Sequence, residues 1–174
     1  MTRPIAHHPD PELDLVFERS VDVPRELVWQ AWTDPEHVKQ WFTPAPWSTV
    51  ECEIDLRPGG IFRTVMRSPE GDEHTNLGCF LEVIEGERLT WTEALEPGFR
   101  PSRTGSHIET CGTSTLTAVI QLTSEGNGTK YTALVMHRSK EDREGHEAAG
   151  FHDGWGAAFE QLVEVVRRLQ TAGA

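Results

Sequence analysis

Two histidines and three acidic residues gather near the end of the sequence, in the stretch HEAAGFHDGWGAAFEQL at residues 146–162. Histidine and carboxylate side chains are common ligands of zinc and other transition metals. The zinc motif HExxH needs a second histidine where this sequence has Gly150. On one regular helix, with about 100° per residue, His146 and His152 point about 120° apart and cannot share an ion. We therefore predict no metal site. A break at Gly150 that brings in His137 as a third ligand is the alternative.

Glu93 is the acidic residue best placed to act inside a pocket. It alternates with Trp91 along an apolar strand pattern, so both side chains lie on one face. Acidic residues within strands more often face solvent, and a polar anchor inside a pocket is the alternative. The motifs GxSxG, CxxC, GxGxxG after a strand and the P-loop are absent from the sequence. We predict no catalytic residue and no cofactor.

The aromatic residues carry more information than the polar ones. Five of them fall within residues 29–47, and others come from a later strand and from the last helix. A large core explains any single one, but the whole set exceeds what a two-layer fold needs, and pockets for small apolar ligands are lined in this way. The predicted ligand-binding residues are Trp41, Phe42, Trp47, Phe62, Phe80, Trp91, Glu93, Met136, His152, Trp155 and Phe159.

Three glycines, Gly150, Gly154 and Gly156, interrupt the last predicted helix. Each costs a helix about 1 kcal/mol relative to alanine. Close packing of the helix backbone on a sheet is one interpretation, and space left by a missing side chain is the other. The two are compatible, because a helix that lies close to a sheet at one end only encloses a wedge-shaped cavity.

Strand and helix patterns follow one another in an order that defines the fold class. Alternating apolar residues predict strands over residues 13–21, 48–56, 61–67, 74–84, 88–95, 114–123 and 130–138. Helical spacing predicts short helices over residues 22–32 and 33–42, and a long one over residues 140–169. We expect Asp22 to cap the first helix, with Pro24 at its first position, and Thr33 or Asp34 to cap the second, with Pro35 in its first turn.

Tight turns between successive strands require antiparallel pairing. One face of such a sheet needs cover, and the long last helix is the element able to provide it. We predict an α+β fold in which an antiparallel sheet of six to seven strands packs on this helix. Residues 96–112 contain two prolines and three glycines without periodicity, so they are either a lid or a disordered insertion.

The chain length and charge limit the classes of function. With 174 residues, the chain fits one domain, which we place at residues 13–170 between a flexible arm (1–12) and a tail (171–174). The net charge of −12 argues against binding to nucleic acid or to an anionic membrane. No signal peptide or membrane-spanning run is recognised, and three widely spaced cysteines fit a reduced, cytoplasmic protein.

Several segments together resemble one family. They are VPRELVWQAWTDPEHVKQWFTP, DLRPGGIFRTVM, EVIEGERLTWT and GFHDGWGAAFEQL. They resemble the START-like superfamily and, within it, the family of the activator of the heat-shock-protein-ninety ATPase, as a stand-alone domain. The resemblance implies a helix-grip fold, in which the sheet curls around the last helix and leaves a deep cavity between them. It also implies apolar ligands such as lipids, sterols or polyketides, and catalysis in a minority of members.

Together, the residues and the resemblance favour a protein that binds a small apolar molecule in this cavity without catalysing a reaction. A cyclase-like, aromatase-like or hydrolytic enzyme that uses the same cavity is one alternative. A module that interacts with a chaperone is another, although co-chaperone members carry an additional N-terminal domain. The sequence leaves open whether the chain acts as a monomer or as a homodimer.

Overall fold

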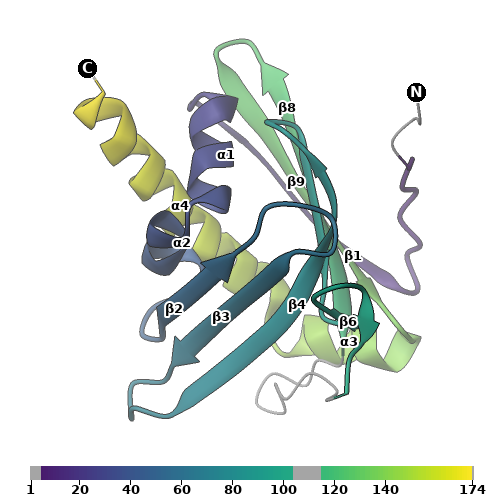
Figure 1. Ribbon diagram of the computed structural model, residues 1–174. Coiled ribbons are helices and arrows are strands. Elements are labelled where there is room, and N and C mark those ends of the chain that lie inside the picture. Colours follow the sequence, from purple (N-terminus) through teal and green to yellow (C-terminus); the bar gives the residue numbers. More distant parts are fainter. Residues whose placement is uncertain (1–4, 104–114, 174) are drawn as a thin grey trace.

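Seven strands of the computed structural model form one antiparallel sheet in the order β1-β9-β8-β5-β4-β3-β2 (Figure 1). The structure describes residues 5–103 and 115–173. The predicted α+β fold with an antiparallel sheet is confirmed. The strands of this sheet are β1 (Asp14–Val21), β2 (Ser48–Ile54), β3 (Ile61–Arg67), β4 (Glu73–Ile84), β5 (Arg88–Thr92), β8 (Leu116–Glu125) and β9 (Gly128–His137).

Two short helices follow β1, as predicted. They are α1 (Arg25–Thr33) and α2 (Pro35–Trp41). The Asp34 side chain caps α2 by accepting a hydrogen bond from the backbone N–H of Glu36 at 2.9 Å. The predicted start of α1 is wrong, because Pro24 occupies the N-cap position and no side chain caps this helix.

The last helical stretch is divided into α3 (Lys140–Ala148) and α4 (Phe151–Ala172), so the prediction of one continuous helix is wrong. Gly150 separates them with a φ of 100°, in the left-handed region that glycine adopts without steric cost. Helix α3 lies across the ends of β1 and β9, where Arg143 Nε donates to the backbone oxygen of Asp14 at 3.3 Å. The chain therefore changes direction at Gly150, between α3 and α4.

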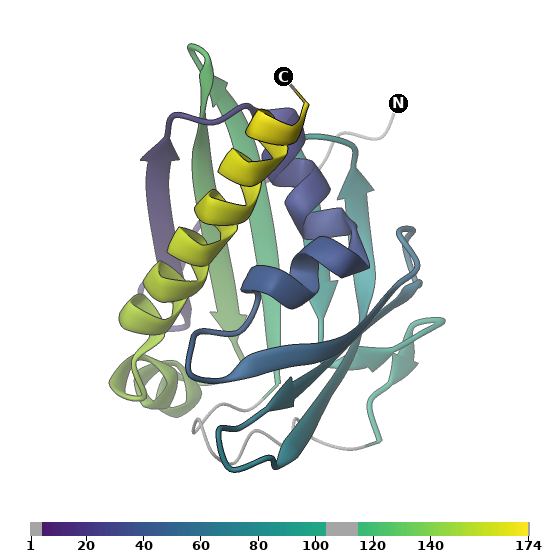
Figure 2. The same cartoon turned by 90° about the vertical axis from the view of Figure 1, so that its left-hand side faces the viewer.

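Helices α1, α2 and α4 lie on one face of the curved sheet (Figure 2). Phe17 of β1 and Tyr131 of β9 point to this face and contact Phe159 of α4, with ring centroids 5.7 and 4.9 Å apart. Further along α4, the side chain of Gln161 connects this helix to the end of α2. Its Nε2 donates hydrogen bonds to the backbone oxygens of Trp41 and Thr43 at 2.9 Å each. The core thus lies between the sheet and the three helices.

A two-stranded hairpin, β6 (Leu95–Glu96) and β7 (Arg100–Pro101), begins the segment predicted as a lid or a disordered insertion. It docks on the β2–β3 turn, where the N–H of Gly98 donates to the Gly59 oxygen at 2.8 Å. The continuation of this segment to Gly112 lies outside the described residues.

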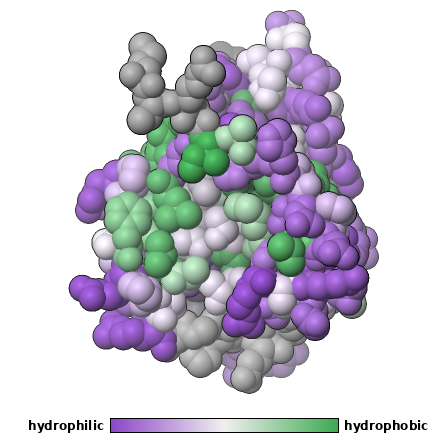
Figure 3. Space-filling view, turned by 90° about the vertical axis from the view of Figure 1, so that its right-hand side faces the viewer, coloured by the Kyte–Doolittle hydropathy of each residue, from purple (hydrophilic) through white to green (hydrophobic). Residues whose placement is uncertain are grey.

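The opposite side of the molecule shows apolar groups scattered among hydrophilic ones (Figure 3).

None of the helices within residues 5–103 and 115–173 is long and apolar enough to cross a membrane.

Candidate functional site

A cavity of about 290 Å³ lies between the concave face of the sheet and the first turns of α4. Helices α1 and α2 and the loop after them form one side, strands β3, β4, β5 and β8 form the floor, and the α3–α4 junction closes the end. Its lining residues are Trp32, Trp41, Phe42, Pro44, Phe62, Thr64, Met66, Asn76, Gly78, Trp91, Glu93, Leu116, His146, Ala149, Gly150, Phe151, Gly154, Trp155 and Ala158.

Aromatic rings from three parts of the chain form a continuous wall of this cavity. Trp32 lies 4.8 Å from Trp41 and 5.2 Å from Trp91, measured between ring centroids. Phe62 completes the wall at 5.7 Å from Phe42 and 5.4 Å from Trp91. Aromatic pairs at such separations stabilise one another, so the wall has its shape before any ligand arrives.

Gly154 leaves space on the α4 side of the cavity. A Cβ atom built at Gly154 meets no atom within 4 Å, whereas one built at Gly156 would contact the Phe17 ring at 3.9 Å. The two glycines therefore differ, although they lie two residues apart on one helix. At Gly154, the missing side chain leaves cavity space, as one of the two sequence interpretations proposed.

Glu93 brings a carboxyl group to the cavity directly after β5. Its backbone N–H donates to the Leu116 oxygen at 3.1 Å, but no described residue hydrogen bonds to its side chain. Burial raises the pKa of this carboxyl from 4.5 to about 7. The cavity therefore holds an acid that is partly protonated near neutral pH.

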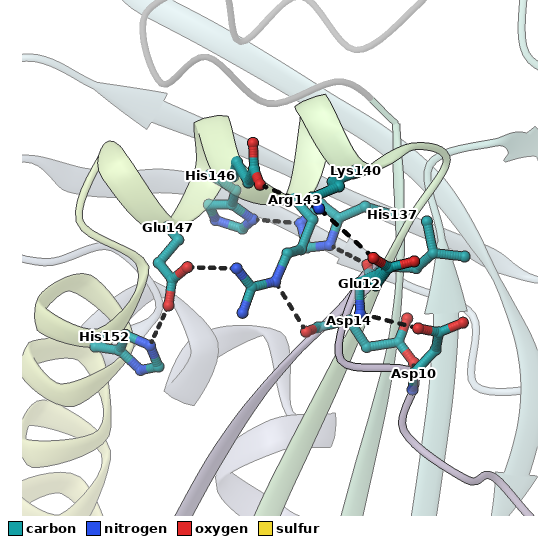
Figure 4. A network of polar contacts seen from close by, with 11 residues as sticks. Asp10, Glu12, Asp14, His137, Lys140, Arg143, His146, Glu147 and His152 are labelled. Carbon is teal, nitrogen blue, oxygen red and sulfur yellow. Dashed lines mark hydrogen bonds and ion pairs between the residues drawn. The ribbon is translucent and has the colours of Figure 1, made fainter.

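His146 brings an imidazole to the same end of the cavity from α3. Its Nδ1 lies 2.8 Å from Nε2 of His137, and Nδ1 of His137 lies 3.0 Å from the backbone oxygen of Leu13 (Figure 4). Burial, followed by the neighbouring His137, lowers the pKa of His146 from 6.5 to about 4, and burial also lowers the pKa of His137. Both rings are therefore neutral at pH 7.

Residues 22–167 match the family described as Activator of Hsp90 ATPase homolog 1-like protein. The chain belongs to this family. A protein from Nitrosomonas europaea, whose crystal structure is known, is 45% identical in sequence to this chain. The two structures superpose with a TM-score of 0.86 over 94% of this chain and 99% of that chain. Comparison with curated proteins finds no match.

More distant relatives share the fold of the family. A protein from Rhodobacter sphaeroides is 20% identical, with a TM-score of 0.76 over 93% of this chain and 97% of its own. One from Arthrobacter aurescens, solved by NMR, is also 20% identical, with a TM-score of 0.75 over 94% of this chain and 92% of its own. Proteins of this START-like fold commonly bind hydrophobic ligands.

In this member of the family, the cavity brings together six of the eleven predicted ligand-binding residues. These are Trp41, Phe42, Phe62, Trp91, Glu93 and Trp155. Their assignment as ligand contacts stays a prediction. The other five lie outside the cavity lining. These are Trp47, Phe80, Met136, His152 and Phe159.

Three of these five side chains pack against other residues and do not line the cavity. Phe80 is fully buried behind the wall, stacked on Phe62 at 5.3 Å. Phe159 fills the core between α4 and the sheet, and Trp47 packs on His74 at 5.4 Å. The sequence pattern identifies these rings as inward-facing but does not distinguish a core ring from a cavity ring.

The remaining two face away from the cavity because of local geometry. Met136 lies between the buried residues Val135 and His137 on β9, and alternation turns it to the opposite face of the sheet. His152 begins α4 with its side chain 56% exposed, and its Nε2 lies 3.4 Å from a Glu147 carboxylate oxygen. The prediction that His152 reaches into the cavity is therefore wrong.

His146 is the functional candidate that sequence reasoning missed. The angular argument compared His146 only with His152, about 120° away, and assumed one regular helix. The break at Gly150 ends that assumption and turns His146 to the cavity. The glycine was a visible signal, and its consequence for His146 needed the path of the chain.

The break at Gly150 also tests the alternative metal site. His146 and His137 do meet, but His152 pairs with Glu147 instead. Among the residues that the structure describes, no group of three His, Cys, Asp or Glu side chains could hold a metal ion.

Proposed function

We propose that this protein binds a small apolar molecule in the cavity between the sheet and α4. The observation that carries the proposal is a space of about 290 Å³ with a mostly apolar lining that includes seven Trp and Phe rings. An engineered apolar cavity of about 150 Å³ binds benzene. A space roughly twice as large suits a ligand with an apolar body of about two rings.

The surroundings of the cavity favour binding over simple core packing. Four tryptophans contribute to the lining, namely Trp32, Trp41, Trp91 and Trp155, and packed rings hold three of them in place. Rigid walls lower the entropic cost of ordering side chains around a ligand. The few polar groups of the lining would then orient the ligand, as in other small-molecule sites.

Titration with 2-methylnaphthalene tests this proposal. We expect saturable quenching of tryptophan fluorescence with a stoichiometry near one, because the lining tryptophans would contact the probe. Gly154→Leu should weaken binding at least about tenfold, since its side chain would occupy the space that the glycine leaves open. Glu160→Leu, on the exposed face of the same helix, is the matched control and should bind like the wild type.

Two results would contradict the proposal. One is the absence of saturable binding by this probe and by naphthalenes of similar size. The other is equal affinity of the wild type and a folded Gly154→Leu variant, which would place the probe elsewhere on the surface.

A second candidate function is catalysis in the same cavity, and Glu93 favours it. A carboxyl group whose pKa is about 7 suits general acid–base chemistry at neutral pH. Glu93→Gln should then abolish turnover of a ligand that still binds, as measured by product formation and by fluorescence titration on the same sample. Turnover that survives this substitution would exclude Glu93 as the acid or base.

A further inference from the structure

We infer that His146 selects the ligand, and that the cavity takes an apolar molecule with one hydroxyl group, an alcohol or a phenol, whose O–H donates to Nε2 of His146. This inference rests on the proposed function and adds to it the chemical class of the ligand. Its basis is the hydrogen-bond chain that runs from Leu13 through His137 to His146.

The direction of that chain follows from its first member. The backbone oxygen of Leu13 can only accept, so Nδ1 of His137, at 3.0 Å, carries the proton. A neutral imidazole has one N–H, and Nε2 of His137 is therefore an acceptor. Nδ1 of His146, at 2.8 Å from it, must then be the donor. Nε2 of His146 is left with a lone pair and no proton.

That lone pair has no partner among the described residues. Nε2 of His146 makes no hydrogen bond to them, and it is not one of the buried polar atoms closed off from solvent. Since His146 lines the cavity, this nitrogen is an acceptor available to a bound molecule. An acceptor beside an aromatic wall favours a ligand that brings a donor, because an apolar ligand would remove its water without replacing the hydrogen bond.

The surrounding contacts hold the imidazole in this position. Figure 4 shows Arg143 on the same helix reaching both the Asp14 backbone oxygen and Glu147. The His146 ring also packs edge-on against Phe151, with centroids 5.1 Å apart. The acceptor is therefore fixed from both sides of the α3–α4 junction before a ligand binds.

The mostly apolar and largely uncharged lining argues for a neutral ligand. A carboxylate ligand has no donor for Nε2 and would lie in the same cavity as the Glu93 carboxyl. Burial of an ammonium group against the aromatic wall would remove its water shell, at a large cost in free energy. A hydroxyl group supplies the donor without a charge.

A set of naphthalenes with equal ring bodies tests the inference. 2-Naphthol donates a hydrogen bond, 2-methoxynaphthalene only accepts one, 2-methylnaphthalene does neither, and 2-naphthoate is anionic. We expect the wild type to bind 2-naphthol at least about tenfold more tightly than the methyl compound, although the methyl compound is the more hydrophobic. The methoxy compound and the naphthoate should bind no better than the methyl compound.

Two variants locate the acceptor. His146→Leu should lose the preference for 2-naphthol and still bind 2-methylnaphthalene, because an apolar side chain replaces the imidazole. His152→Leu, which changes a mostly exposed histidine outside the cavity lining, is the control and should keep the preference. A folded His146→Leu variant that keeps the preference for 2-naphthol would overturn the inference.

A direct measurement covers the case that His146→Leu does not fold. NMR of the wild type labelled with ¹⁵N-histidine reports which ring nitrogen carries the proton. We expect a protonated Nδ1 and an unprotonated Nε2 on His146, with the Nε2 resonance shifted by 2-naphthol and left in place by 2-methylnaphthalene. The opposite tautomer, or an Nε2 resonance that does not shift when 2-naphthol is added, would overturn the inference.

The ligand set also separates this inference from the proposed function. If none of the naphthalenes binds, the proposed function fails. If all of them bind the wild type with similar affinity, the proposed function stands and the role of His146 as the selecting residue is wrong.

Discussion

At the scale of single residues, the polar end of the cavity is occupied by two groups that burial keeps neutral in opposite ways. Burial raises the pKa of Glu93 to about 7, which favours its protonated form. Burial lowers the pKa of His146 to about 4, which favours its unprotonated form. Between these two values, both side chains are largely neutral, and the cavity exposes no full charge from them to an apolar ligand.

The first prediction concerns Glu93 and stability. Its pKa is raised above 4.5 on folding, so the folded protein binds the proton more tightly than the unfolded chain. The free energy of unfolding therefore falls as the pH rises from about 4.5 to about 7. Glu93→Gln cannot ionise and should be more stable than the wild type by about 1–3 kcal/mol at pH 8, with little difference at pH 4.

Urea unfolding at both pH values measures this difference. Glu160→Gln removes a carboxyl group from the exposed face of α4 and is the matched control. A stability difference between the wild type and Glu93→Gln that does not change with pH would contradict the prediction. It would show that ionisation of Glu93 does not lower the free energy of unfolding.

The second prediction concerns His146, for which the free energy of unfolding changes with pH in the opposite direction. Its pKa is lowered from 6.5 on folding, so the unfolded chain binds the proton more tightly between about pH 6.5 and 4. The free energy of unfolding therefore falls as the pH decreases through this range. After allowance for solvent screening of a half-buried ring, His146 contributes about 1–2 kcal/mol to this loss.

The slope of stability against pH checks the contribution of His146. His146→Leu should flatten the curve between pH 6.5 and 4, whatever its effect at pH 7. His152→Leu, which removes a mostly exposed histidine from the start of α4, is the control and should keep the wild-type slope. Equal slopes in all three proteins would contradict the prediction.

At the scale of elements, the three glycines near the start of α4 have three different structural roles. Gly150 separates α3 from α4 with a positive φ, Gly154 leaves cavity space, and a Cβ added at Gly156 would lie at ordinary contact distance from the Phe17 ring. The sequence identified the group as unusual, because each glycine weakens a helix. It did not distinguish the three, because backbone conformation and distance to the sheet depend on contacts far apart in the chain.

The third prediction separates these roles by alanine substitution. Gly150→Ala should lower the free energy of unfolding by about 1–2 kcal/mol, because its φ of 100° is unfavourable for an L-residue. Gly154→Ala should raise it by about 0.5–1 kcal/mol, since alanine favours the helix and its Cβ has room. Urea unfolding of both variants provides the measurement. A stabilising Gly150→Ala would mean that α3 and α4 can join without strain.

At the scale of the whole molecule, the sequence predicted the fold well and the site in part. Alternating residues predict strands because a sheet has two faces, so the order of strands and helices along the chain and the antiparallel α+β fold could be inferred. The helix-grip arrangement was implied by the resemblance to the family. The same alternation cannot say how far an inward-facing ring is from the next layer. Trp91 and Phe80 both point inward, yet only Trp91 lines the cavity. That difference depends on the curvature of the sheet and on where α2 rests.

The position of α2 depends on Gln161, which leads to the last prediction. Its side chain makes three hydrogen bonds to the backbone around the end of α2, to the oxygens of Trp41 and Thr43 and from the N–H of Ala45 at 3.0 Å. Gln161→Leu leaves these backbone groups without their partner and should cost about 1–3 kcal/mol. Because Trp41 also lines the cavity, ligand affinity should fall about three- to tenfold together with stability.

The matched control for Gln161→Leu is Gln40→Leu, on the exposed side of α2. Gln40 accepts one hydrogen bond from Arg168 of α4 at 3.2 Å, so it also joins the two helices, but at the surface. Its loss should change the free energy of unfolding by no more than about 0.5 kcal/mol and leave affinity for 2-methylnaphthalene unchanged. If both variants behave alike in urea unfolding and in fluorescence titration, apolar contacts alone hold α2 against α4. The shape of the cavity would then be independent of Gln161, and the wall that α2 contributes would owe its position to the packing of Trp32, Trp41 and Phe42.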